Sequence, residues 1–233
     1  MLLDNKVAVI TGGGRGIGKA IALELAKNGA DIVIASRDKK EIDSAAKEIT
    51  ALGRKALTVK TDVTKLTDIK NMVKKTVKEL GKIDILVNNA GILFHGPFED
   101  IKHEQIDATV DVNLLGTMHV TREVIPELKK QKEGLIINIS SVAGKEGYVD
   151  LAVYSATKFG VIGFTESIAG ELENENIRVY AICPTATQTK MWEQISDQPA
   201  AHVPGDVALE IIHLIKNRKK IHPGSAINVK KRV

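Results

Sequence analysis

Short apolar runs rich in β-branched residues alternate with longer amphipathic stretches along the whole chain. Each run is bounded by glycine or polar residues, which predicts strands at 7–10, 32–35, 56–59, 83–87, 135–139, 179–182 and 226–229. The stretches between them have helical periodicity, most clearly 17–26, 38–52 and 66–80, and each of these three ends at a glycine. Strands that alternate with helices pair in parallel through right-handed crossovers. The sequence therefore predicts one doubly wound α/β domain over 1–233, a parallel sheet of about seven strands with helices on both faces.

The composition fits a folded domain in a reducing compartment. Hydrophobic residues make up 43% and charged residues 27% of the 233 residues, so we expect a full core. The single cysteine, Cys183, lies in an apolar run and cannot form an internal disulfide. No signal-peptide pattern precedes the first strand, and no apolar run approaches the roughly 20 residues that a membrane span needs. These features predict a cytoplasmic protein that does not associate with membranes.

The net charge of +4 leaves nucleic-acid binding as a minor alternative. Much of the excess lies in the lysines and arginines of 216–232, but no aromatic or glycine pattern of a nucleic-acid-binding module accompanies them. We expect a solvated surface and no nucleic-acid partner, with attraction of an anionic substrate or carrier as a weaker alternative. The histidines have no ligand spacing and no cysteine set beside them, so no metal site is expected.

A glycine-rich turn follows the first expected strand and precedes a helix. It reads Thr11-Gly-Gly-Gly-Arg-Gly-Ile-Gly18. Glycines at this place let backbone N–H groups approach a pyrophosphate, which the positive end of the helix dipole also attracts. The turn favours a Rossmann-type nucleotide site over a plain tight turn. The residues expected to bind the cofactor here are Gly12, Gly14, Arg15, Gly16, Ile17 and Gly18.

The end of the second expected strand distinguishes NADP from NAD. An acidic residue there would accept a bond from the ribose 2′-hydroxyl and repel a 2′-phosphate, but the position holds Ser36, followed by Arg37. Together with Arg15 in the turn, two guanidinium groups could clasp a 2′-phosphate. We therefore expect NADP(H), the alternative being that both arginines are ordinary surface residues.

Three residues near the fifth strand suggest acid–base chemistry. Tyr154 and Lys158 lie four apart and would share one face of a helix, and Ser141 follows the strand at the edge that forms the cleft of such folds. A nearby ammonium favours phenolate, so Lys158 is expected to lower the tyrosine pKa from its usual value of about 10. Tyr154 would then be the general acid in carbonyl reduction and the base in oxidation, while Ser141 holds the substrate oxygen. Taken singly, each residue could equally be a cap, a packed ring or a solvated charge.

Together these motifs resemble the short-chain dehydrogenase/reductase family over nearly the whole chain, including members that reduce 3-oxoacyl thioesters. The resemblance rests on Thr11-Gly12-x-x-x-Gly16-x-Gly18, Asp62-Val63, Asn88-Asn89-Ala90-Gly91, Asn113, Ser141, Tyr154-x-x-x-Lys158 and Pro184. It implies the strand order 3-2-1-4-5-6-7. It also implies a catalytic tetrad of Asn113, Ser141, Tyr154 and Lys158.

The resemblance further implies how the remaining residues surround the ligands. Lys158 would also bind the nicotinamide ribose hydroxyls, and Asn113 would support a water chain that resupplies the proton. The adenosine would be bordered by Asp62, Val63, Asn89, Ala90 and Gly91. The nicotinamide side would be contacted by Tyr154, Lys158, Pro184, Thr185, Thr187 and Thr189, and the substrate by Ser141, Tyr148, Tyr154 and Met191. Thr185 stands where the family often has glycine, so the family's backbone path there is not carried over.

The late part of the chain bears on access to the site and on assembly. Residues 186–205 show no clear pattern, and so long a stretch predicts a mobile lid over the substrate. The segment after the last strand lacks the glycine-rich ending that forms a tetramer contact in many relatives. We therefore expect a homodimer through the two long helices, with a homotetramer as the alternative.

These observations predict an NADP(H)-dependent oxidoreductase with a small-molecule substrate. It would reduce a ketone, an aldehyde or the carbonyl of a 3-oxoacyl thioester to an alcohol, or catalyse the reverse reaction. The alternative from another class is a non-catalytic NADP(H)-sensing or scaffold protein on the same fold. A sensor has no need for all four tetrad residues, which favours the enzyme.

Overall fold

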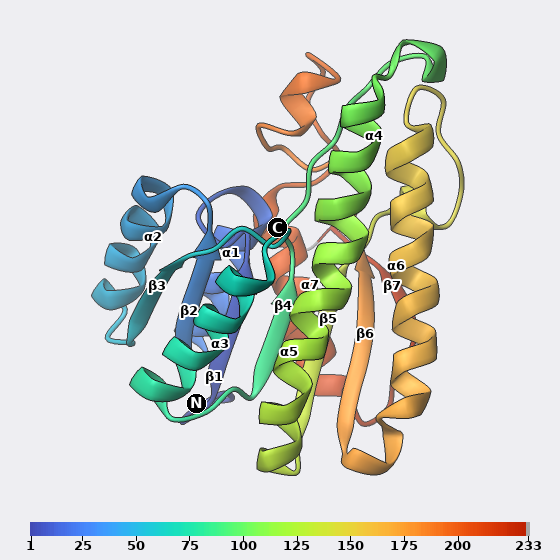
Figure 1. Ribbon diagram of the computed structural model, residues 1–233. Helices are drawn as coiled ribbons and strands as arrows, with labels where there is room; N and C mark the ends of the chain where they lie inside the picture. The colour runs from blue at the N-terminus through green and yellow to red at the C-terminus, as the bar shows by residue number, and fades with distance from the viewer. Residues whose placement is uncertain (232–233) are drawn as a thin grey trace.

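Seven parallel strands form one sheet in residues 1–231, the part of the chain that a computed structural model describes. Their order is β3-β2-β1-β4-β5-β6-β7 (Figure 1), which confirms the predicted order and fold class. The strands are β1 (Val7–Thr11), β2 (Asp31–Ser36), β3 (Ala56–Lys60), β4 (Ile85–Asn88), β5 (Gly134–Ile139), β6 (Ile177–Cys183) and β7 (Ala226–Asn228). Arg232, at the end of the basic stretch, lies outside the described residues.

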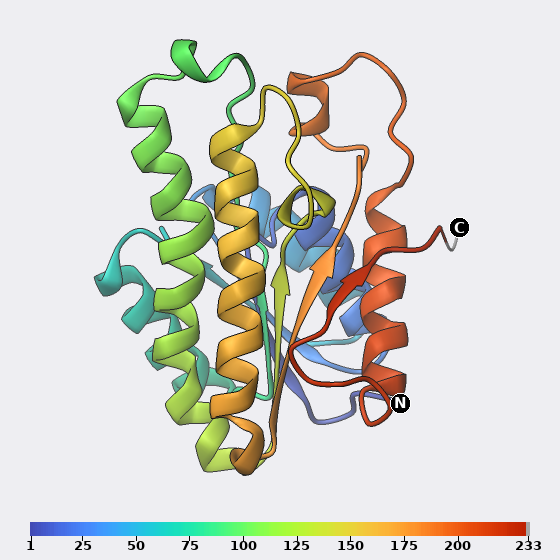
Figure 2. The ribbon, with the colours of Figure 1, turned by 90° about the vertical axis from the view of Figure 1, so that its right-hand side faces the viewer.

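Helices cover both faces of this sheet. One face packs against α1 (Gly16–Lys27), α2 (Lys39–Ala51) and α7 (Pro204–Asn217), and the other against α3 (Leu66–Leu80), α5 (Gly116–Gln131) and α6 (Ala152–Glu171). In Figure 2 the strands lie between α6 and α7. Successive strand residues enter opposite cores, as Ala8 and Val9 do, because side chains alternate along a strand. The helices of the described chain are too short or too polar to cross a membrane.

Short helical segments complete the described structure. A π-helix, η2 (Asp111–Leu115), joins α4 (His103–Val110) to α5. The 3-10 helices are η1 (Phe98–Asp100), η3 (Val142–Gly144), η4 (Glu173–Glu175) and η5 (Trp192–Gln194).

Local sequence signals set the helix ends. The Asp38 side chain caps α2 by accepting hydrogen bonds from the N–H groups of Lys40 at 2.9 Å and Glu41 at 3.1 Å. Gly81 ends α3 in the left-handed region, with φ of 85°. These ends are as the sequence predicts.

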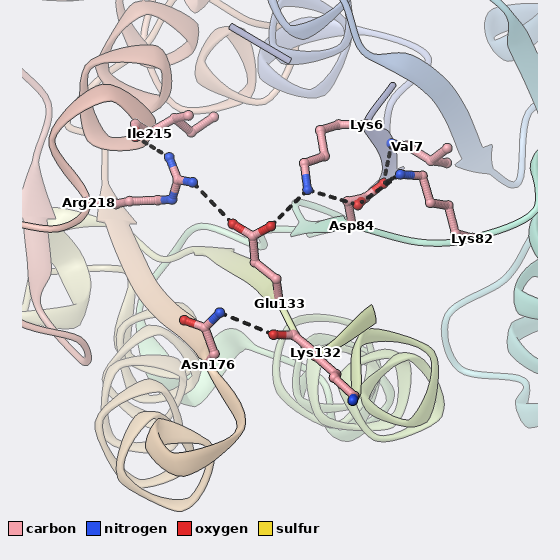
Figure 3. A network of polar contacts seen from close by, with 9 residues as sticks. All are labelled: Lys6, Val7, Lys82, Asp84, Lys132, Glu133, Asn176, Ile215 and Arg218. Atoms are coloured by element: carbon pink, nitrogen blue, oxygen red, sulfur yellow. Dashed lines mark hydrogen bonds and ion pairs between the residues drawn. The ribbon is translucent and has the colours of Figure 1, made fainter. Parts of the chain in front are cut away.

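A network of charged residues ties the elements together at the amino ends of the central strands (Figure 3). The buried Asp84 carboxylate accepts hydrogen bonds from the Val7 N–H at 2.8 Å and from the Lys6 ammonium at 3.2 Å. Lys6 also donates to Glu133 at 3.0 Å, and Glu133 in turn pairs with Arg218 at 3.3 Å. The network therefore links β1, β4, β5 and the end of α7, on the sheet edge opposite the candidate site.

Candidate active site

A large cavity lies at the carboxyl ends of the strands. Its volume is about 1010 Å³, at the upper end of the range for ligand pockets. The predicted residues that line it are Gly12, Arg15, Gly16, Ile17, Gly18, Ser36, Arg37, Asp62, Val63, Asn89, Ala90, Gly91, Ser141, Tyr148, Tyr154, Lys158, Pro184, Thr185, Thr187, Thr189 and Met191. Gly14 and Asn113 are not among its lining residues.

The glycine turn at one end of the cavity is shaped for an anion. Gly12 and Gly16 have positive φ values of 63° and 51°, a conformation that favours glycine. A Cβ atom on Gly18 would come within 2.3 Å of the Gly12 carbonyl oxygen, so the first turn of α1 can only pack this closely without a side chain. No side chain caps the N-terminus of α1. Its first N–H groups therefore suit the phosphates of a dinucleotide, and the residues present fit such a cofactor.

Gly14, which the sequence predicts as a cofactor-binding residue, packs against α2, and its contact with a cofactor stays a prediction. A Cβ atom there would lie 2.9 Å from the Cβ of Glu41, so Gly14 lets the turn pack against α2. Its contribution to the site is to permit this close packing.

One of the two arginines expected to bind a 2′-phosphate is already paired with an acidic residue, Glu41, which was not predicted from the sequence. The Arg15 guanidinium pairs with the Glu41 carboxylate at 3.2 Å, and Glu41 lines the cavity together with Arg15, Ser36 and Arg37. Arg37 faces Asp62, whose pKa is affected in opposite directions. Burial raises it, but hydrogen bonds from Thr64 and the Arg37 charge hold the pKa of Asp62 below its usual value.

The three predicted catalytic side chains converge at the other end of the cavity. Tyr154 and Lys158 both lie on α6 and line the cavity, with the Lys158 ammonium 5.5 Å from the centre of the tyrosine ring. The Lys158 side chain is buried and donates a hydrogen bond to the Ile139 carbonyl at 2.8 Å. Ser141 caps η3 by accepting from the Ala143 N–H at 3.1 Å. Both its capping role and its place beside the tyrosine are thus realised.

The protonation of this group differs from the prediction. Burial raises the pKa of Tyr154 to about 12, and the Ser141 hydroxyl only partly opposes it. Burial also lowers the pKa of Lys158 to about 8. In the free protein the pKa of Tyr154 thus lies above its usual value rather than below it, because desolvation disfavours the charged form of both groups. The effect of Lys158 on the phenol stays a prediction. In this structure, Tyr154 is a protonated phenol at neutral pH.

Asn113 stands behind the cavity wall in the π-helix. Its amide oxygen accepts from the Ile92 N–H at 2.8 Å, and its amide nitrogen donates to the Ile92 carbonyl at 2.9 Å and to the Thr157 hydroxyl at 3.2 Å. It is only 1% exposed. Asn113 thus fastens the chain that follows β4 to α6, one residue before Lys158. No motif in the sequence singles out Thr157.

A buried amide pair joins two strands to two helices, and its contacts were not predicted, although Asn88 belongs to one of the family motifs. Asn88 and Asn138 are register partners at the ends of β4 and β5, and the Asn88 amide nitrogen donates to Asn138 at 2.9 Å. Asn88 also donates to Thr121 of α5 at 2.8 Å, and Asn138 to Thr165 of α6 at 2.9 Å. The available signal was an asparagine directly after one apolar run, at 88, and another inside a second run, at 138. These bonds hold both helices to the two central strands.

The segment predicted as a lid has more structure than expected. The His202 N–H donates to the Ala186 carbonyl at 3.0 Å, and the Gln188 N–H donates to the His202 carbonyl at 2.9 Å, which closes the segment at its base. Within it, the Trp192 indole donates to the Gln198 carbonyl at 2.7 Å. Its last two predicted residues, 204–205, belong to α7.

Two of the predicted substrate residues come from loops, Tyr148 from the loop between η3 and α6 and Met191 from the lid segment. Tyr148 is 41% exposed, and its hydroxyl donates to Glu146 at 2.6 Å. Met191 lines the cavity together with Trp192 and Ile195. Within residues 1–231, no cluster of three or more histidine, cysteine or acidic side chains could hold a metal ion.

The fold and this arrangement of residues define one known class of protein. The family model for short chain dehydrogenases matches residues 6–200, and the chain belongs to that family, as the resemblance predicts. It is therefore an oxidoreductase of the short-chain dehydrogenase type.

Several known proteins are similar to this chain in sequence or in structure. The 3-oxoacyl-(acyl-carrier-protein) reductase of Thermotoga maritima is 41% identical over 198 residues, which cover 85% of this chain and 80% of that protein. The corresponding reductase of Staphylococcus epidermidis is 35% identical and covers 97% of both chains. The crystal structure of the 3-ketoacyl-(acyl-carrier-protein) reductase of Brucella melitensis complexed with NADH has a TM-score of 0.92 and 34% identity, and covers 97% of both chains. Levodione reductase has the same TM-score of 0.92 at 25% identity, covering 98% of this chain and 97% of its own.

Proposed function

We propose that this chain is an NADP(H)-dependent reductase that converts a ketone, an aldehyde or a 3-oxoacyl thioester to the corresponding alcohol, or catalyses the reverse reaction. The observation that carries the proposal is the convergence of Ser141, Tyr154 and Lys158 on the cavity that also contains the uncapped N-terminus of α1. A sensor or scaffold would require the nucleotide end of this cavity but not the other end.

When bound, the cofactor supplies or accepts the hydride. Tyr154 gives its hydroxyl proton to the substrate oxygen as hydride reaches the carbonyl carbon, and in oxidation the phenolate takes that proton back. A phenol held protonated by burial suits the reductive direction. Ser141 donates a hydrogen bond to the same oxygen and fixes its position.

Two further residues serve the tyrosine indirectly. Lys158 binds the nicotinamide ribose hydroxyls and passes a proton to Tyr154 after turnover, a role that suits a pKa of about 8. Asn113 is a positioning residue, since its donor hydrogens are engaged by Ile92 and Thr157. With its amide oxygen it supports the water chain that resupplies Lys158.

The choice of NADP(H) rests on Ser36, Arg37 and Arg15 at the adenosine end. There is no acidic residue at the end of β2, where one would repel a 2′-phosphate. A relative has been crystallised with NADH, so the cofactor of this chain has to be measured. Tighter binding of NADH than of NADPH would refute this part of the proposal.

The substrate class follows from the walls near Tyr154 and from the relatives. Met191, Trp192 and Ile195 come from the lid segment, and Leu93 and Leu151 from other walls, so this end of the cavity is apolar. Two close relatives are named for reduction of 3-oxoacyl groups on a carrier protein, and a structural neighbour for reduction of levodione. We propose that the substrate is an uncharged, apolar carbonyl compound, and that acyl thioesters are the first compounds to test. Residues 186–205 act as the lid over it.

The decisive experiment follows NADPH absorbance with a panel of 3-oxoacyl thioesters, diketones and short aldehydes. Tyr154→Phe should abolish turnover of every active substrate while leaving NADPH affinity nearly intact, because the change removes one hydroxyl at the reacting end. Normal turnover in this variant would overturn the assignment. NADPH binding without turnover of any substrate would favour the sensor.

We also propose a homodimer through α5 and α6, the two longest helices described. Light scattering on the purified protein separates this from a tetramer. A location in the cytoplasm stays a prediction from the sequence.

A further inference from the structure

The structure assigns Glu41 a part in cofactor choice: we infer that its carboxylate weakens the grip of Arg15 on a 2′-phosphate and so narrows the preference for NADPH over NADH. The inference rests on the proposed cofactor site. It concerns a residue of α2 that neither the glycine turn nor the end of β2 contains.

Glu41 is held against the glycine turn by packing. Glu41 lies in the first turn of α2. A Cβ atom added to Gly14 would be 2.9 Å from the Cβ of Glu41. Its carboxylate lies 3.2 Å from the Arg15 guanidinium, and the two side chains are 26% and 61% exposed. Both line the cavity beside Ser36. A phosphate bound by Arg15 would therefore compete with the Glu41 carboxylate for the same guanidinium group.

Two neighbouring acids accept their hydrogen bonds from groups other than the arginines, although the charge of Arg37 also acts on Asp62. Asp38 caps α2 through the N–H groups of Lys40 and Glu41. Asp62 accepts from the Thr64 N–H at 3.1 Å and from the Thr64 hydroxyl at 2.8 Å. Glu41, in contrast, forms an ion pair with Arg15, one of the two arginines on which recognition of the phosphate depends.

The sign of the effect follows from the charges. A 2′-phosphate carries about −1.5 to −2 charges near neutral pH, like other phosphate monoesters, and a carboxylate on the same guanidinium repels it. An ion pair this exposed holds a long side chain only weakly, so repulsion outweighs any benefit from orienting Arg15. A 2′-hydroxyl carries no charge and is not repelled. Glu41 should therefore penalise NADPH selectively.

The test compares nucleotide binding in the wild type, Glu41→Gln and Glu48→Gln. Glu48 is the matched control, because it lies on the same helix and pairs with Lys19 of α1 at 2.7 Å without lining the cavity. Dissociation constants for NADPH and NADH are measured by fluorescence titration, at low and high salt. Thermal unfolding of each variant verifies that it is folded.

Glu41→Gln should bind NADPH about three- to tenfold more tightly, with NADH affinity changed less than about twofold. The gain should shrink at high salt, because salt screens exposed charges. Glu48→Gln should match the wild type for both nucleotides. Unchanged or weaker NADPH binding by Glu41→Gln, or an equal gain for NADH, overturns the inference.

The two proposals fail in different ways. A wild type that binds NADH more tightly than NADPH refutes the proposed cofactor, while the Glu41→Gln comparison still tests the inference. A wild type that prefers NADPH, with no gain in Glu41→Gln, refutes the inference alone. Absence of binding by either nucleotide refutes both.

Discussion

Replacing Asn113 with aspartate should destabilise the protein in a way that grows with pH. The substitution keeps the shape of the side chain but replaces the amide NH₂, which donates to the Ile92 carbonyl at 2.9 Å and to Thr157 at 3.2 Å, with an oxygen. The position is 1% exposed. A carboxylate there would face the Ile92 carbonyl oxygen without a donor between them, so only the protonated acid can restore the bond. Its pKa in the folded state must therefore exceed the unfolded value of about 3.9.

The magnitude follows from proton linkage. A group whose pKa is raised on folding costs about 1.4 kcal/mol of stability for each pH unit above its unfolded pKa, until the folded pKa is reached. Between pH 5 and pH 7, Asn113→Asp should thus lose up to about 2.7 kcal/mol relative to the wild type. For a chain of this length, that corresponds to a fall of about 5–11 °C in Tm.

The assay is thermal unfolding by circular dichroism at both pH values, with the wild type measured in parallel so that its own pH dependence is subtracted. Thr157→Val is the control, because it removes the 3.2 Å bond, and the bond from the same hydroxyl to the Tyr154 carbonyl at 2.7 Å, without adding a titratable group. It should cost about 1–2 kcal/mol equally at both pH values. A Tm difference between Asn113→Asp and the wild type that does not change with pH would refute the reasoning.

Other positions give further expectations. Glu133→Gln should cost at most about 1 kcal/mol at pH 7, because the carboxylate is half exposed, and less at pH 3. The hydrogen bond from Lys6 lowers the pKa of Glu133, so its stabilisation is fully present above the unfolded value of about 4.5 and declines as pH falls through the folded value. Denaturant unfolding at both pH values checks this. Gly18→Ala should cost about 1–3 kcal/mol and weaken NADPH binding at least about tenfold, whereas Gly170→Ala, with nothing within 4 Å, should do neither. Trp192 is the only tryptophan, so its emission should report ligand binding beneath the lid segment; an emission unchanged by saturating NADPH and substrate would mean that the segment does not respond.

The sheet was predictable because its signals are local. Each strand is a short apolar run, and the order of strands follows from the family motifs. The α3 bounds of 66–80 coincide with the prediction, since its apolar period and Gly81 are both visible in the sequence. The glycine turn predicted Gly12, Arg15, Gly16, Ile17 and Gly18 of the cavity lining, whereas Asp62, Val63 and 89–91 followed from the family motifs.

The features that were not predicted from the sequence share one cause, which is contact between residues far apart in the chain. Glu41 reaches Arg15 across 26 positions, and Asn113 reaches Thr157 across 44. No local pattern encodes such pairs. The structured base of the lid is of the same kind, because His202 closes on Ala186 through backbone groups that every residue has.

The pKa of Tyr154 shows how such contacts change the chemistry. Burial places the pKa of Lys158 at about 8 and that of Tyr154 at about 12. In the free enzyme we therefore expect the lysine to lose its charge at a lower pH than the phenol, so that little ammonium is left to stabilise phenolate. Ultraviolet titration of the free enzyme, with Tyr154→Phe subtracted to remove the signals of the other tyrosines, should show no phenolate from Tyr154 below about pH 11. Lys158→Met should leave that titration unchanged. A Tyr154 that ionises near neutral pH in the free enzyme, and no longer does so in Lys158→Met, would show that the ammonium, and not burial, controls the acid.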